Sequence, residues 1–241
     1  MTAAPPGAAV FHCSRHRCDM SKETILASVR RSLGVSGREL PRRTGVDDRL
    51  AAAPRGVVPA RGQGDQGERL AKFIEMAAVA QASLVEVASA AEVPQAVAAF
   101  LREHNLPATI RRGDDLRLAA MPWHTTTLAL ASGASDGQDL NAVSHALAGI
   151  AETATLVLVS GRDNPTTLNF LPDNHIVVVD AKDILPDYEA MWTALRARYG
   201  KGEMPRTVNW ITGPSRSADI EQTLLLGAHG PRRLHVIVVN G

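Results

Sequence analysis

The sequence predicts an α/β fold in which a mostly parallel sheet is flanked by helices. From about residue 67 the apolar pattern alternates between helical and strand periods. Several strand segments are continuous aliphatic runs, as at residues 234–239, and such runs are typical of strands buried on both faces. Aromatic residues make up only 4% of the 241 residues. The core must therefore consist mainly of Ala, Val, Leu and Ile, which suits helices packed on a parallel sheet.

The composition describes an ordinary soluble chain with one sizeable core, because 45% of its residues are hydrophobic. The charge is balanced, with 26 Lys and Arg against 25 Asp and Glu. This disfavours a nucleic-acid-binding protein, which normally needs a strongly basic face. No stretch reaches the roughly 18 apolar residues that a membrane span needs. Both Cys residues precede residue 20. This excludes a disulfide framework for the rest of the chain, so a reducing, cytoplasmic location is expected.

An N-terminal arm, residues 1–66, differs from the rest of the chain. It carries 11 Lys and Arg against 6 Asp and Glu, whereas residues 67–241 carry 15 against 19. A short helix is expected over residues 21–33, because a serine precedes its apolar pattern and a glycine follows it. Gly and Pro recur through residues 34–66, which predicts a linker.

The first 19 residues are expected to be a spurious or disordered extension. They contain four possible zinc ligands, at His12, Cys13, His16 and Cys18, but these are crowded into one loop without a second half-site. Met20 directly precedes the expected helix, so we expect translation to begin there.

The domain expected at residues 67–241 alternates helices and strands. Helices are predicted over residues 68–80, 90–104, 187–199 and 218–225. Strands are predicted over residues 83–87, 108–111, 117–120, 127–131, 141–144, 154–160, 175–179, 207–212 and 234–239. This order is typical of a domain whose strands pair in parallel.

A Gly-Pro-Ser turn links the strand at 207–212 to the last predicted helix. It would place the hydroxyls of Ser215 and Ser217 at a helix N-terminus, where an anion is favoured. The same pattern also fits Ser217 as a simple N-cap, with Asp219 and Glu221 as acids that complement the helix dipole. Those acids would oppose an anion, and the local pattern leaves both interpretations open.

Three blocks of sequence carry a family signature. The first is Ala-Glu-Thr-Ala-Thr-Leu-Val at residues 151–157, and the second, at 171–179, begins Leu-Pro-Asp-Asn-His. The third is Ile-Thr-Gly-Pro-Ser-Arg-Ser-Ala-Asp-Ile-Glu at 211–221, followed by Gly-Ala-His-Gly-Pro-Arg. Together they resemble the LUD-domain family, specifically its lactate utilization protein C branch, from about residue 67 to the end. Ala154 departs from the glycine usual in the family, which restricts φ at that turn.

The resemblance implies a fold similar to the superfamily of ribose-5-phosphate isomerase, glucosamine-6-phosphate deaminase and CoA-transferase. It also implies an accessory role in a cytoplasmic system that oxidises L-lactate to pyruvate, together with iron–sulfur partner subunits. We expect no cofactor in this chain itself. Residues 19–241 contain no Cys to hold a cluster, and no Gly-x-Gly-x-x-Gly turn follows a strand.

Glu152 is the candidate catalytic residue, since a glutamate is the acyl-accepting nucleophile in the CoA-transferase part of that superfamily. The alternative is a buried or rim carboxylate that bonds to its own turn. Three functions therefore stay open. They are the accessory component, a free-standing acyl- or CoA-transferring enzyme that uses Glu152, and a sugar-phosphate binding protein that uses the Gly213–Ser217 turn.

The candidate ligand-binding residues come from the same blocks. They are Thr153, Thr155, Gly213, Ser215, Arg216, Ser217, Asp219, Glu221 and His229. If the blocks meet, these side chains and Glu152 should line one cleft at the ends of neighbouring strands, where a small carboxylate or phosphate could bind. No metal site is expected, because the histidines at 175, 229 and 235 lack ligand spacing.

Overall fold

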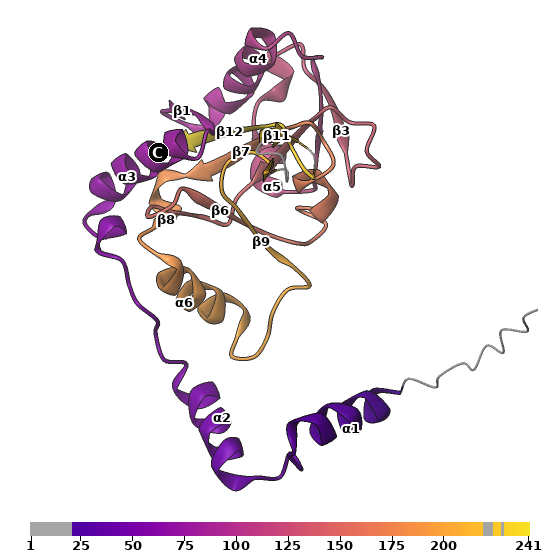
Figure 1. The fold of residues 1–241 in the computed structure, drawn as a ribbon. Helices are drawn as coiled ribbons and strands as arrows, with labels where there is room; N and C mark the ends of the chain where they lie inside the picture. Colours follow the sequence, from indigo (N-terminus) through magenta and orange to yellow (C-terminus); the bar gives the residue numbers. More distant parts are fainter. Residues whose placement is uncertain (1–20, 219–223, 228) are drawn as a thin grey trace, which may run out of the picture. The chain divides into compact units, whose positions relative to one another are not determined.

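The computed structural model describes residues 21–218, 224–227 and 229–241, and it divides the chain into two compact units. The described part of the first unit, which ends at Pro54, contains α1 (Lys22–Leu33) and α2 (Leu40–Ala52) (Figure 1). The prediction of α1 is confirmed. The hydroxyl of Ser21 accepts a hydrogen bond from the Thr24 N–H at 3.2 Å, and Gly34 ends the helix with φ 63°.

The prediction of an irregular linker over residues 34–66 is wrong for residues 40–52, which form α2. Pro41 lies in the first turn of this helix, where a missing N–H costs no hydrogen bond. Neither α1 nor α2 has a buried residue. Gly and Pro were therefore misleading here, because both can be tolerated near helix ends and on exposed faces.

The second unit, Arg55–Gly241, holds the remaining elements. Its α-helices are α3 (Gln66–Val79), α4 (Val93–Glu103), α5 (Leu116–Ala120) and α6 (Tyr188–Tyr199). Its 3₁₀ helices are η1 (Ala60–Gly62), η2 (Ala90–Glu92), η3 (Trp123–Thr125), η4 (Thr166–Asn169) and η5 (Ala181–Asp183). Its strands are β1 (Ser83–Val87), β2 (Thr109–Arg112), β3 (Ala129–Ser132), β4 (Asn141–His145), β5 (Ala148–Ile150), β6 (Thr155–Val159), β7 (Asn174–Asp180), β8 (Ile184–Leu185), β9 (Val208–Ile211), β10 (Arg216–Ala218), β11 (Leu224–Leu226) and β12 (Arg233–Val239).

The main sheet has six strands in the order β1-β12-β7-β4-β2-β3, and every neighbouring pair is parallel. This confirms the predicted α/β class with a parallel sheet. Successive residues of the central strand β7 point to opposite faces. Ile176 and Val178 pack with Phe100 of α4, whereas Val177 and Val179 pack with Phe73 of α3. Both faces of the sheet are therefore covered, as the continuous aliphatic runs predicted.

A second sheet of four strands, in the order β8-β5-β6-β9, was not predicted from the sequence. The β5–β6 and β6–β9 pairs are antiparallel, and the β5–β8 pair is parallel. Leu156 and Leu158 of β6 join the core beside α3, whereas Val157 packs with Met191 and Leu195 of α6. The second sheet therefore lies between α6 and the core shared with the main sheet.

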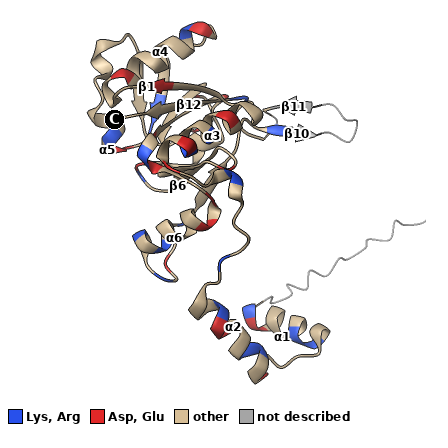
Figure 2. Ribbon diagram, turned by 90° about the vertical axis from the view of Figure 1, so that its left-hand side faces the viewer, with Lys and Arg blue, Asp and Glu red and all other residues tan. Residues whose placement is uncertain are grey.

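Two further predictions of secondary structure are wrong. Residues 117–120 were expected to be a strand but belong to α5, because Asp115 caps that helix by accepting from the N–H groups of Arg117 and Leu118. The helix expected over 218–225 is also contradicted, since β10 and β11 form an antiparallel pair there (Figure 2). Residues 219–223 between them lie outside the described residues.

Within the described ranges, no helix combines the length and the apolar character that crossing a bilayer demands.

Candidate functional site

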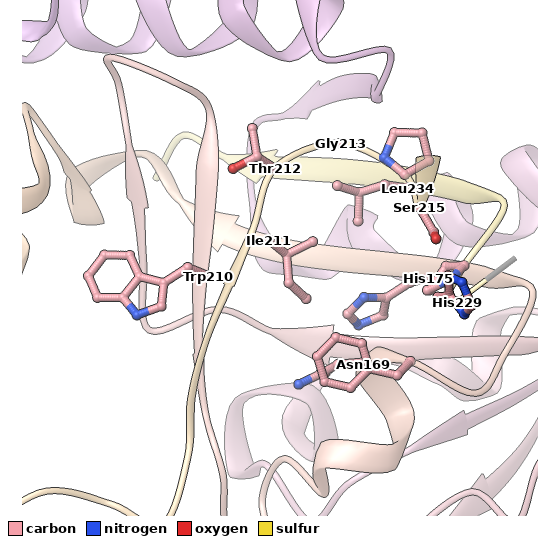
Figure 3. Close-up of a pocket in the computed structure, with 13 residues that line it drawn as sticks. Asn169, His175, Trp210, Ile211, Thr212, Gly213, Ser215, His229 and Leu234 are labelled. Carbon is pink, nitrogen blue, oxygen red and sulfur yellow. The ribbon is translucent and has the colours of Figure 1, made fainter. Parts of the chain in front are cut away.

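A cavity of about 250 Å³ opens where the carboxyl end of β9 meets the beginnings of β7 and β12 (Figure 3). It is lined by Asn169, Phe170, His175, Trp210, Ile211, Thr212, Gly213, Pro214, Ser215, His229, Gly230, Pro231 and Leu234. With respect to the main sheet, the cavity lies at the amino ends of the parallel strands. Open α/β sheets usually bind ligands at the carboxyl ends of their strands, so this cavity lies at the opposite end of the sheet.

The turn after β9 forms one wall of the cavity, and its conformation requires glycine. Gly213 has φ 71°, and a Cβ atom there would lie 2.2 Å from the carbonyl oxygen of Ala80. The turn thus packs directly against the carboxyl end of α3. Ser215 then fixes the opposite wall, because its N–H donates to the Pro231 carbonyl at 2.8 Å and its carbonyl accepts from the Gly227 N–H at 2.9 Å.

Two buried polar side chains lie at the floor of the cavity. Asn169, at the end of η4, is 1% exposed, and neither its amide nitrogen nor its amide oxygen has a partner in the described chain. His175 on β7 is 0% exposed. Its Nε2 lies 3.0 Å from the Ser144 hydroxyl, but its Nδ1 is unpartnered. Buried polar groups are normally paired, so these atoms, which are themselves buried, have unused hydrogen-bonding capacity.

The imidazole of His175 is neutral under ordinary conditions. Complete burial lowers its pKa to about 3, because the charged form would lose its hydration. His175 belongs to the second family block, which begins Leu-Pro-Asp-Asn-His, and the sequence excluded it only as a metal ligand. Asn169 was missed, since nothing in its local sequence shows that its amide would be left without a partner.

Several candidate ligand residues do line this cavity. Gly213, Ser215 and His229 come together there, and Figure 3 shows Ser215 and His229 at the same side of it. Arg216 directly follows Ser215 and is exposed. The backbone of Ser217 lies in β10, paired with residue 225. The positions expected for Asp219 and Glu221 lie outside the described residues.

Glu152 is not among the residues that line the cavity. It is 4% exposed and lies under η1, where a Cβ atom on Gly62 would come within 2.9 Å of the Glu152 Cβ. Burial raises the pKa of its carboxyl group, Arg61 opposes that shift, and Asp187 adds to it. Its Oε2 has no partner in the described chain. The structure therefore separates Glu152 from the residues with which it was expected to share a cleft.

Thr153 and Thr155 belong to a cluster of hydroxyl groups beside the cavity. The Thr155 hydroxyl lies 2.7 Å from that of Thr153, 2.8 Å from that of Tyr188 and 2.6 Å from that of Thr212. Thr212 also lines the cavity. The block at 151–157 thus reaches the cavity wall through Thr155 and not through its glutamate.

The carboxyl ends of β4 and β7 carry a charged cluster. His145 lies 3.8 Å from Asp180, and Arg117 pairs with Asp115 at 2.7 Å. Burial lowers the pKa of His145, and the nearby Arg117 guanidinium lowers it further. In the part of the chain that the structure describes, no group of three or more His, Cys, Asp or Glu is placed to hold a metal ion.

Comparison with known proteins supports the family resemblance. Residues 141–239 match the LUD domain model, and this range includes every residue that lines the cavity. Lactate utilization protein C of Geobacillus sp. (strain WCH70) is 40% identical over 91 residues, which is 37% of this chain and 38% of that protein. The same-named protein of Geobacillus kaustophilus is 34% identical over 126 residues, or 49% and 52% of the two chains. The matched part thus covers about half or less of these relatives.

A solved structure is similar over a longer part of the chain. A DUF162 family protein from Deinococcus radiodurans has a TM-score of 0.56 and 27% sequence identity, over 73% of this chain and 99% of that one. The ordered blocks of sequence and the matched domain model agree on one family. Residues 141–239 are therefore similar to the LUD domain.

Proposed function

We propose that this chain acts in lactate utilization, as a cytoplasmic accessory component that binds a small molecule and assembles with iron–sulfur partner subunits. The relatives that match part of this chain are named Lactate utilization protein C. The chain has no Cys between residues 19 and 241, so partner subunits would have to hold any cluster that is bound by four cysteines. The likeness to the CoA-transferase superfamily is part of the same proposal.

The cavity between β9, β7 and β12 is the observation that carries this proposal. It lies wholly within the matched domain, and two buried side chains at its floor, Asn169 and His175, carry polar atoms that have no partner in the described chain. An unsatisfied buried group costs stability, so its presence calls for a compensating role. Binding a ligand at Asn169 and His175 supplies that role.

The two competing functions have weaker physical support. Acyl transfer by Glu152 would require a substrate to reach a carboxylate that η1 covers. The sugar-phosphate alternative relied on a helix N-terminus after Ser215, but the chain continues there as β10. The accessory role needs neither feature.

A growth experiment tests the proposal. In a strain whose growth on L-lactate depends on this gene, we expect Asn169→Leu to impair growth on lactate but not on glucose. Asn209→Leu is the matched control, because Asn209 is also a buried asparagine with an unpartnered amide nitrogen but does not line the cavity. Equal growth of the two variants would contradict a role for the cavity.

A purification experiment tests the partners. We expect the full chain, isolated from its native host grown on lactate, to bring down a Cys-rich protein together with iron. Chain grown and purified alone is the control and should contain no iron. Recovery of the chain from lactate-grown cells without any iron-containing partner would contradict the assembly that we propose.

A further inference from the structure

We propose that the cavity receives an uncharged, planar, hydrogen-bonding part of its ligand, either a primary amide or a nitrogen heterocycle, and that it excludes a carboxylate. This inference rests on the proposed function, because it concerns the same cavity. It goes further by naming the chemical class of the group that is bound.

The walls of the cavity favour an uncharged group. Among the described residues that line it, none is Lys, Arg, Asp or Glu. The walls are largely apolar and include Trp210, Ile211 and Leu234 (Figure 3). A carboxylate placed there would lose its hydration without gaining an ion pair in return, which is strongly unfavourable. A flat uncharged ring or amide would instead bury apolar surface against these side chains.

The side chains at the floor of the cavity carry both hydrogen-bond donors and acceptors that the described chain leaves unpartnered. The Asn169 amide supplies two N–H donors and one acceptor oxygen. The neutral His175 ring carries a single N–H. When the Ser144 hydroxyl donates to Nε2, that N–H is on the unpartnered Nδ1. An amide or a heterocycle with a donor beside an acceptor can satisfy these groups together, whereas a carboxylate offers acceptors alone.

The size of the cavity also favours a ligand larger than lactate. Its volume of about 250 Å³ is many times what a single water molecule needs. A lactate ion would leave much of that space unfilled, and unfilled space forfeits contacts. A six-membered ring that carries an amide would fill more of it.

Charged groups of the ligand have a place outside the cavity. Arg216 follows the lining residue Ser215, and Arg232 follows the lining residue Pro231. Both arginines are exposed, and Arg232 lies 3.9 Å from Asp173 in an exposed ion pair. A ligand with an uncharged head in the cavity and an acidic group near these arginines therefore fits the charge distribution.

A matched pair of probes tests the inference. Nicotinamide and nicotinate share one ring and one shape, but only nicotinate carries a carboxylate at neutral pH. We expect calorimetry on the full chain to show nicotinamide binding at least about tenfold more tightly than nicotinate or L-lactate. Tighter binding of nicotinate or lactate would overturn the inference. Adenine serves as a second uncharged heterocycle. The absence of saturable binding of both nicotinamide and adenine at millimolar concentration would also overturn the inference.

A variant pair locates the binding. We expect Asn169→Leu to weaken nicotinamide binding at least about tenfold, whereas Asn209→Leu should leave it unchanged. Circular dichroism and thermal unfolding verify that both variants are folded. Unchanged affinity in folded Asn169→Leu would mean that the floor holds a bridging water only, and would overturn the inference.

The growth and binding experiments can fail separately. If the chain binds nicotinamide selectively but growth on lactate does not require the chain, this inference is supported and the proposed function is contradicted. If growth on lactate depends on Asn169 but the chain binds lactate in preference to nicotinamide, the proposed function is supported and this inference is contradicted.

Discussion

The Thr155 hydroxyl lies 2.6 Å from the Thr212 hydroxyl, and this contact between residues 57 positions apart joins two of the family blocks. Thr155 is completely buried on β6, while Thr212 follows β9 and lines the cavity. The backbones of β6 and β9 pair antiparallel beside it, with Leu156 opposite Ile211. The contact therefore fixes the cavity wall to the core of the second sheet.

Replacing Thr155 with Val should destabilise the fold while preserving the shape of the side chain. The change leaves the hydroxyls of Thr212 and Tyr188 with one partner fewer, so we expect the free energy of unfolding to fall by about 1–3 kcal/mol. Urea unfolding followed by circular dichroism measures this loss. Thr153→Val, at a half-buried member of the same cluster, is the control and should cost less. An equal cost at both positions would contradict the central role of Thr155.

Asn169→Leu should stabilise the protein even though it impairs function. The asparagine amide is buried without a partner, and leucine is a close match in shape that carries no polar group. We expect the free energy of unfolding in the absence of ligand to rise by about 1–3 kcal/mol. Thermal unfolding of the two proteins in the same buffer gives the comparison. A lower melting temperature for the variant would show that the amide is satisfied in solution, for example by an ordered water.

Glu152→Gln should change how stability depends on pH. Burial raises the folded-state pKa of Glu152 above its ordinary value of 4.5, so the folded protein binds this proton more tightly than the unfolded chain does. Stability therefore falls as pH rises from about 4.5 through the raised folded-state pKa, and the penalty is complete above it. Glutamine does not ionise, so the variant should lack this loss.

Unfolding of both proteins in urea at several pH values from 4 upward measures the difference. We expect the stability of Glu152→Gln relative to the parent chain to increase with pH and then level off. A difference independent of pH would contradict the raised pKa. If the Glu152→Gln protein is fully folded but its strain grows poorly on lactate, the result would instead favour the catalytic role that the sequence suggested.

Local signals in the sequence predicted the long elements well. The serine and glycine that bound α1 lie at its caps, as expected. The helix expected from residue 68 is α3, which starts two residues earlier at a capping box of Asp65 and Glu68. The buried runs at β7 and β12 were also predicted, because a central parallel strand has no polar face. In each case the information lies within a few residues of the element.

Short elements depended on the fold and were not predicted. The strands β5 and β8 have three and two residues, too few to show a period, and they exist because β6 and α6 cover them. At residue 154, in contrast, a single position did predict the local backbone conformation. The family's usual glycine indicates a positive φ there, and Ala154 does have φ 53°.

The candidate site was predicted only in part for the same reason. Gly213, Ser215 and His229 could be proposed from one block and its neighbouring loop, and they do line one cavity. Asn169 could not, because its importance arises from the partners that it lacks in three dimensions. Glu152 of the first block was proposed because a carboxylate can act as a nucleophile. Its burial under η1 depends on a segment that is about 90 residues away in sequence.

Gly213→Ala tests whether the cavity wall depends on close packing against α3. The added Cβ would lie 2.2 Å from the Ala80 carbonyl oxygen, in a residue whose φ of 71° already disfavours alanine. We expect the free energy of unfolding to fall by about 2–4 kcal/mol, since backbone strain and a steric clash add together.

The control is Gly202→Ala, where φ is 83° but no atom lies within 4 Å of the added Cβ. It should cost only about 1–2 kcal/mol, which is the conformational penalty alone. Urea unfolding of both variants separates the two contributions. The difference between them measures the clash with α3, so equal losses would mean that the turn can move away from Ala80. In that case the wall of the cavity would be adaptable, and nicotinamide binding to Gly213→Ala should remain close to that of the parent chain.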